Sequence, residues 1–113
     1  MKIKEIFSEK RPVFSLEIFP PKPDYPLETI YQTLEELHAL APDYISVTYG
    51  AGGSSRGRTM EIARHIRETY KIEALAHLTC VNHTRQEIAE ILHGLQGAEV
   101  QNVLALRGDP PQN

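Results

Sequence analysis

The chain is organised around one stretch near its start, Val13-Phe14-Ser15-Leu16-Glu17-Ile18-Phe19-Pro20-Pro21-Lys22. This apolar run is typical of a β-strand, and the two prolines end it because they cannot donate to a sheet. A carboxylate inside a buried strand is unfavourable unless a function requires it there. Two interpretations of Glu17 are therefore open: it points to water from an edge strand, or it is a catalytic carboxyl at the end of a buried strand.

Length and composition restrict the class of protein. The chain has 113 residues, a formal net charge of −3 and one cysteine. This length suits one small domain, and the balanced charge argues against nucleic acid or an anionic membrane as the main partner. The apolar runs are too short for a transmembrane span, and the start of the chain lacks the apolar core of a secretory signal. With a single cysteine, these features predict a cytoplasmic protein.

Hydrophobic periodicity divides the chain into alternating strands and helices. We expect strands at 12–19, 43–49, 73–79 and 101–106, and helices at 26–41, 57–70 and from Thr84 onward. The third helix has the clearest start, because Thr84 and Glu87 form a capping box. Residues 1–11 are predicted to form a short helix or an arm on the outside.

The order of these elements predicts the fold class. Strands recur about every 30 residues and are joined by helices, as in βαβ units with a parallel sheet and right-handed crossovers. Eight such units make a (β/α)8 barrel of about 250 residues. Four strands and three connecting helices correspond to about half of this barrel, or alternatively to a small open α/β sheet.

Polar side chains occur at the end of every predicted strand. They are Glu17 at the first, Thr48 and Tyr49 at the second, His77 and Thr79 at the third, and Arg107 and Asp109 after the fourth. In parallel α/β folds the functional site lies at the carboxyl ends of the strands. Each residue also has a plain structural explanation, such as a core histidine or a loop salt bridge. Four such ends at one edge nevertheless favour a site.

Two other patterns are weaker. The glycine-rich stretch 50–55 lacks the spacing of a dinucleotide-binding motif, although its backbone could hold an anion before a helix. A small α/β module that binds an anion there is therefore an alternative function. His77, Cys80 and His83 supply three potential metal ligands, but their placement on a strand end and loop does not favour a zinc site.

Four separated motifs resemble the methylenetetrahydrofolate reductase family. They are Phe14-Ser15-Leu16-Glu17-Ile18-Phe19-Pro20-Pro21-Lys22, Val47-Thr48-Tyr49-Gly50-Ala51-Gly52-Gly53 with Arg58-Thr59, Ala76-His77-Leu78-Thr79-Cys80, and Leu104-Ala105-Leu106-Arg107-Gly108-Asp109-Pro110-Pro111. The resemblance covers nearly the whole chain, in order. Leu16 and Ile18 depart from it, because aromatic residues are usual beside the family's glutamate.

The resemblance implies a (β/α)8 barrel that carries FAD. It implies that NADH or NADPH reduces the flavin, which then reduces 5,10-methylenetetrahydrofolate to 5-methyltetrahydrofolate in one-carbon and methionine metabolism. Glu17 matches the general acid that opens the folate ring, and desolvation at an apolar strand end would favour its protonated form. Thr48 matches a nicotinamide contact. The flavin-binding positions are matched by Tyr49, Ala51, His77, Arg107 and Gly108, and Asp109 matches a carboxylate near both flavin and folate.

The family's barrel continues through four further strands. We therefore expect residues 1–113 to form one partial domain, the N-terminal half of a barrel with two open sheet edges. The open edges predict a homo-oligomer. The alternative function is a non-catalytic half barrel that self-associates or binds flavin weakly.

Overall fold

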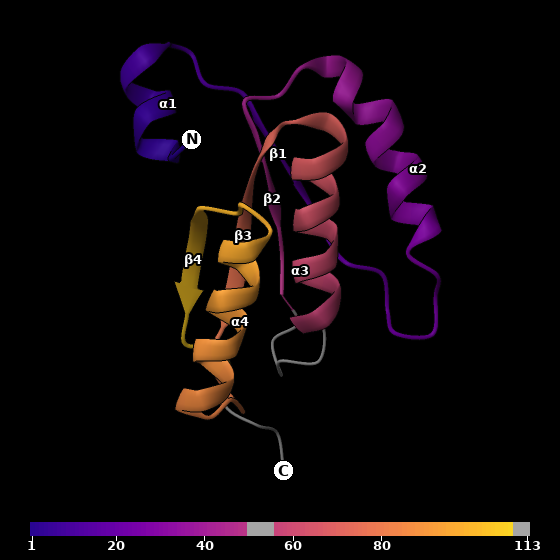
Figure 1. The fold of residues 1–113 in the computed structure, drawn as a ribbon. Helices are drawn as coiled ribbons and strands as arrows, with labels where there is room; N and C mark the ends of the chain where they lie inside the picture. The colour runs from indigo at the N-terminus through magenta and orange to yellow at the C-terminus, as the bar shows by residue number, and fades with distance from the viewer. Residues whose placement is uncertain (50–55, 110–113) are drawn as a thin grey trace.

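The computed structural model describes residues 1–49 and 56–109, and shows a four-stranded parallel sheet with helices on one face (Figure 1). The strands are β1 (Ser15–Ile18), β2 (Tyr44–Val47), β3 (Glu73–Thr79) and β4 (Asn102–Leu106), in the spatial order β1-β2-β3-β4. The helices are α1 (Ile3–Glu9), α2 (Glu28–Leu37), α3 (Arg56–His65) and α4 (Arg85–Gly97). The predicted α/β class is confirmed, and the sheet resembles half of a barrel.

The strand register separates a covered face from an open face. Leu16 pairs with Ile45 and Ile45 with Ala74, so these side chains lie together against the helices. Among the described residues, the buried core on this side contains Ile18, Leu34, Ile45, Val47, Ile62, Ala63, Ile66, Ala74, Ala76, Leu78, Ile91, Leu95, Ala98 and Val100. The intervening residues, Glu17 and His77 among them, lie on the opposite face, which no described helix covers (Figure 1).

The predicted helices differ from the observed ones at their ends. Pro26 lies outside α2, because Leu27 is the N-cap, and a 3-10 turn (His38–Leu40) follows that helix. α3 continues as a π-helical turn, Ile66–Tyr70. α4 begins as predicted: the Glu87 N–H donates to Thr84 Oγ1 at 3.1 Å, and the Thr84 N–H donates to Glu87 Oε1 at 3.3 Å.

Ile62 and Gly94 belong to the packing of α3 and α4. Ile62 of α3 is fully buried. Gly94 lies within α4, which continues to Gly97, and Met60 of α3 approaches it closely. A Cβ at position 94 would lie 2.6 Å from Met60 Sδ, so only glycine fits without a shift of Met60.

The N-terminal segment crosses the amino ends of the strands. α1 is a short helix, which confirms one of the two alternatives expected for residues 1–11. The side chain of Asn102, at the start of β4, binds the first residues of the chain. The Ile3 N–H donates to Asn102 Oδ1 at 2.9 Å, and Asn102 Nδ2 donates to the Met1 carbonyl at 3.1 Å. Of the helices in the described ranges, none combines the length and apolar character that a membrane crossing requires.

Candidate active site at the carboxyl edge of the sheet

Glu17 and His77 meet on the open face of the sheet. They lie on β1 and β3, with β2 between them, and His77 Nε2 is 3.6 Å from Glu17 Oε1. The His77 side chain is 12% exposed and that of Glu17 is 52% exposed. The sequence predicted that strand ends would bring these two together, and an acid beside an imidazole is able to hold or transfer a proton.

The environment of Glu17 combines the two interpretations left open by the sequence. β1 is an edge strand of the observed sheet, and Glu17 faces away from the helices. The expected desolvation by an apolar strand end is therefore not supplied by the described residues. A covering layer over the open face would have to provide it.

Thr48 is fixed through its backbone at the end of β2. Its N–H donates to the Ile18 carbonyl at 3.0 Å, and its carbonyl accepts from Thr59 Oγ1 at 2.8 Å. Thr59 is buried in the first turns of α3. These two bonds fix the point where the chain leaves β2. Ala51 and the glycine-rich stretch lie outside the described residues.

Arg58 ties α3 to the segment that follows β1. Its guanidinium donates to the Tyr25 carbonyl at 2.7 Å and to the Pro23 carbonyl at 2.9 Å. Arg58 and Thr59 belong to one of the motifs quoted from the sequence, but no role was predicted for either. Both have a positioning role here, because they hold backbone at the carboxyl edge.

The segment Arg107–Asp109 is held beside the end of β3. The Cys80 N–H donates to the Leu106 carbonyl at 2.8 Å, and the Val81 N–H donates to the Arg107 carbonyl at 3.0 Å. Sheet-like pairing thus continues beyond both strands. The side chains of Arg107 and Asp109 are exposed at this edge, on the side of the molecule where Thr48 and His77 also lie.

Gly108 is required by its conformation and by its neighbours. Its φ is +92°, and a Cβ at this position would lie 2.4 Å from Thr79 Cγ2 and 2.6 Å from Val81 Cγ1. L-residues avoid this region of φ, and such contacts are too short for any side chain. The backbone of Gly108 therefore packs directly on the side chains of Thr79 and Val81 at the end of β3, and a side chain at position 108 would separate the two segments.

Tyr49, which was predicted as a flavin-binding position, directs its side chain to the helix side of the sheet. Its ring packs against the core on the helix side, and its hydroxyl lies 2.8 Å from Nε2 of His83. His83 was considered only as a metal ligand from the sequence. In the described part of the chain, no group of three or more His, Cys, Asp or Glu residues is arranged to hold a metal ion.

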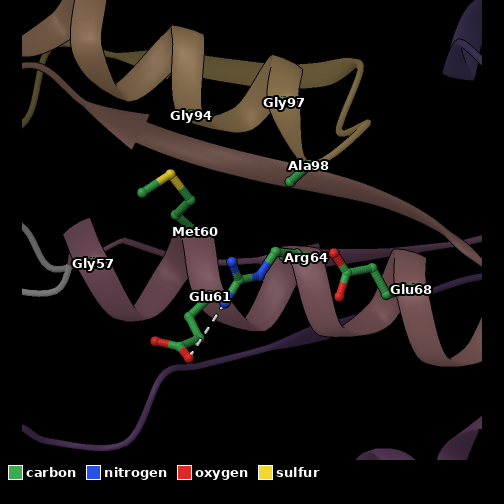
Figure 2. Close-up of a pocket in the computed structure, with 8 residues that line it drawn as sticks. All are labelled: Gly57, Met60, Glu61, Arg64, Glu68, Gly94, Gly97 and Ala98. Atoms are coloured by element: carbon green, nitrogen blue, oxygen red, sulfur yellow. Dashed lines mark ion pairs between the residues drawn. The ribbon is translucent and has the colours of Figure 1, made fainter.

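Two grooves between α3 and α4 lie on the helix side of the sheet, not on the open face that carries Glu17 and His77. The groove in Figure 2 has a volume of about 310 Å3 and lies between α3 and α4. Met60 projects toward Gly94 across it, and Arg64 forms an ion pair with Glu61 at 3.6 Å (Figure 2). Among the described residues, the polar groups of the carboxyl edge come from the ends of all four strands.

Comparison with known proteins identifies the family. The family model for methylenetetrahydrofolate reductase matches residues 2–113. A probable methylenetetrahydrofolate reductase (NADH) of Oryza sativa subsp. japonica is 40% identical over 110 residues, which are 97% of this chain and 18% of the relative. The 5,10-methylenetetrahydrofolate reductase of Pectobacterium carotovorum is 39% identical over 98 residues, 87% of this chain and 33% of the relative.

The reductase of Escherichia coli is similar at 36% identity over 97 residues, 86% of this chain and 33% of the relative. The chain thus spans between about a fifth and a third of the length of these relatives. Because the family model covers almost every residue, the match does not depend on any single motif. The chain belongs to the methylenetetrahydrofolate reductase family.

Proposed function

We propose that residues 1–113 form the N-terminal half of the catalytic barrel of a methylenetetrahydrofolate reductase. The assembled enzyme reduces 5,10-methylenetetrahydrofolate to 5-methyltetrahydrofolate in one-carbon and methionine metabolism, with NADH or NADPH as reductant. The observation that carries this proposal is the pairing of Glu17 with His77 at 3.6 Å on the open face. It supports the proposal because a substrate that covered the open face would meet the Glu17 carboxyl.

The carboxyl edge is suited to a flat, polar cofactor such as FAD. Gly108 offers backbone without a side chain, and His77 and Arg107 offer ring and guanidinium N–H donors. Together with Thr48 and Tyr49, which follow β2, and with Ala51, which lies outside the described residues, these residues would hold the flavin and the nicotinamide. When bound, FAD would supply the hydride that reduces the one-carbon unit.

The protein's own groups have separate tasks in this proposal. Glu17 donates a proton to a folate nitrogen, which opens the five-membered ring to an iminium that accepts hydride. His77 lies against the Glu17 carboxyl and orients it. Asp109 holds a negative charge near the flavin and the pterin, which disfavours further negative charge on the ring and makes hydride donation easier.

Glu17→Gln tests the acid assignment. The variant is assayed in a chimera in which residues 1–113 replace the matching segment of the Escherichia coli relative, and Glu28→Gln on α2 is the matched control. Folate reduction should fall by at least about 100-fold, the usual range for loss of a general acid, while flavin reduction by NADH persists. Equal folate reduction in Glu17→Gln and Glu28→Gln would contradict the proposal.

A second function is favoured by the exposed face and edges. Phe19, Leu104 and Leu106 are exposed, and β1 and β4 are the outer strands of the sheet. A half barrel that self-associates would cover these groups, which is why we expect a homo-oligomer. A purified chain that elutes as a colourless dimer, without a flavin spectrum after FAD is added, would favour this function over the first.

We also propose a cytoplasmic protein without nucleic-acid or membrane partners. The formal net charge of −3 is small for a chain of this length and supports this assignment. The anion-binding module remains a competing function only if the purified chain binds phosphate but neither flavin nor folate.

A further inference from the structure

We propose that His83, together with Glu87, is a positioning residue that fixes Tyr49 and thereby the flavin-binding edge of the sheet. The proposal rests on the proposed function for the flavin itself. The side-chain arrangement stands independently of it. Neither residue was assigned a role in the reductase by the sequence motifs.

The first observation is the direction of the Tyr49 side chain. Along β2, Ile45 and Val47 face the helices, and Tyr49 continues this alternation and packs against the same core. Its ring meets the His83 ring edge-to-face, with centroids 5.9 Å apart and an interplanar angle of 89°. The side chain of Tyr49 is therefore held from the helix side, and its backbone is the part directed to the carboxyl edge.

The second observation is the burial of His83. Its side chain is 4% exposed, and its Nδ1 makes no hydrogen bond but lies 3.5 Å from Glu87 Oε2. A buried imidazole nitrogen without a partner is costly, so the nearby carboxylate has a defined effect. It favours the tautomer with the proton on Nδ1, which leaves Nε2 to accept from the Tyr49 hydroxyl at 2.8 Å.

The third observation is how Glu87 is held. The capping box of α4 fixes it, because Thr84 and Glu87 each donate a backbone N–H to the other's side chain. Glu87 therefore has a defined place relative to the first turn of α4. The contacts thus run from α4 through Glu87 and His83 to Tyr49, and they join the segment after β3 to the segment after β2, with His83 and Tyr49 34 residues apart in sequence.

The same segment also contacts the last strand end. Val81, two residues before His83, donates its N–H to the Arg107 carbonyl at 3.0 Å and lies against Gly108. A displacement of His83 would thus shift the backbone that approaches Gly108 as well as Tyr49. Of the proposed flavin-binding positions that the structure describes, Tyr49, Arg107 and Gly108 take part in these contacts, and His77 does not.

The test combines a thermodynamic cycle with FAD titration of the purified chain. Tyr49→Phe and His83→Ala should each raise the unfolding equilibrium constant in urea by about two- to tenfold, the usual effect of one hydrogen bond. The double variant should differ little from His83→Ala alone, because both remove the same bond. His93→Ala, which removes an exposed histidine of α4, is the matched control.

FAD affinity, measured by quenching of flavin fluorescence, separates positioning from mere stability. Tyr49→Phe and His83→Ala should weaken FAD binding by about two- to tenfold at temperatures where both variants are folded. His93→Ala should not weaken it, and His83→Gln should restore part of the affinity because its amide can accept from Tyr49. Additive effects in the cycle would show that the bond does not exist, and coupling with unchanged FAD affinity would overturn the positioning role.

The two proposals fail in different ways. A wild-type chain that binds no FAD would remove the flavin site, and the positioning role with it, whatever the cycle shows. A wild-type chain that binds FAD as tightly as Tyr49→Phe and His83→Ala would overturn only the role of His83.

Discussion

The two edges of the sheet hold their polar side chains in different ways. At the amino edge they are joined to one another: Arg67 pairs with Glu73 at 3.2 Å, and Lys10 pairs with Asp43 at 2.8 Å. At the carboxyl edge the Glu17–His77 contact is longer, at 3.6 Å, and Arg107 and Asp109 are exposed. The amino edge is organised for stability, and the carboxyl edge leaves polar groups available to a ligand, as α/β barrels divide these roles.

An aromatic cluster between α2 and α3 extends the amino edge. The rings of Tyr31 and His65 are stacked with centroids 4.0 Å apart, and those of His38 and Tyr70 at 4.5 Å. The Tyr70 hydroxyl donates to Glu35 at 2.8 Å, and burial together with this bond raises the pKa of Tyr70 to about 12. These groups are committed to each other, so we expect substitutions here to change stability without changing ligand binding.

The largest effect on the comparison should come from Gly108→Ala at the carboxyl edge. The positive φ and the clash with Thr79 and Val81 together predict a loss of about 2–4 kcal/mol in the free energy of unfolding. Urea unfolding of the purified chain measures this loss. Gly57→Ala, whose Cβ would meet nothing within 4 Å, is the control, and equal destabilisation by both variants would contradict the close approach at Gly108.

The sequence predicts the contacts at the two edges well when the contacting residues are close together in the chain or follow from strand periodicity. Strand periodicity placed Glu17 and His77 at the same edge, and β3 was predicted with its observed bounds, Glu73–Thr79. The capping box fixed the start of α4, and with it the spacing of four residues that brings Glu87 to His83. That spacing was the available signal for His83, which the motifs did not use.

The rest depends on contacts that no local pattern encodes. The partner of His83 is Tyr49, 34 residues earlier, and Asn82 adopts a φ of 62° in the turn that brings them together. Asn102 bonds to residues about 100 positions away. Such pairings follow from the three-dimensional arrangement of strand ends, which the alternation of strands and helices limits but does not determine.

At the amino edge, Asn102→Ala should produce the next largest effect. It removes both bonds to the N-terminal segment from a buried side chain, and we expect a loss of about 1–3 kcal/mol in the free energy of unfolding. Urea unfolding measures the loss, and limited proteolysis should show faster cleavage around α1. Gln101→Ala, at an exposed neighbouring position, is the control; FAD affinity that changed with Asn102→Ala would break the division between the two edges.

A smaller effect should appear on acidification, through His65. Burial lowers the pKa of His65, and the nearby carboxylates of Glu68 and Glu35 only partly oppose this. The unfolded chain therefore takes up a proton before the folded one: the stability is complete above about pH 6.5 and declines as the pH falls toward the folded-state pKa. Urea unfolding at a series of pH values should show this decline in the wild type and a weaker one in His65→Phe.

The exposed His93 supplies the control for this pH dependence. His93→Phe should keep the wild-type decline below about pH 6.5, because its side chain is exposed on α4. A second decline is expected at lower pH from Asp43, whose pKa is lowered by hydrogen bonds from Lys10 and from the Phe14 N–H. The contribution of Asp43 to stability is present above about pH 3.8 and is lost below it. If His65→Phe shows the same decline of stability below about pH 6.5 as the wild type, the prediction for His65 is contradicted.

The smallest effect on stability should come from substitutions of two glycines in the last turn of α4, Gly94 and Gly97. At Gly97 an added Cβ meets nothing within 4 Å, so Gly97→Ala should raise the free energy of unfolding by about 0.5 kcal/mol through the unfolded chain's lost freedom. Gly94→Ala places its Cβ 2.6 Å from Met60 Sδ, which Figure 2 shows directed at this turn. Because the thioether can move, the gain in helix propensity and the displacement of Met60 should nearly offset each other. Thermal unfolding should therefore rank Gly97→Ala above Gly94→Ala, and the reverse order would show that α3 and α4 are not held at this separation.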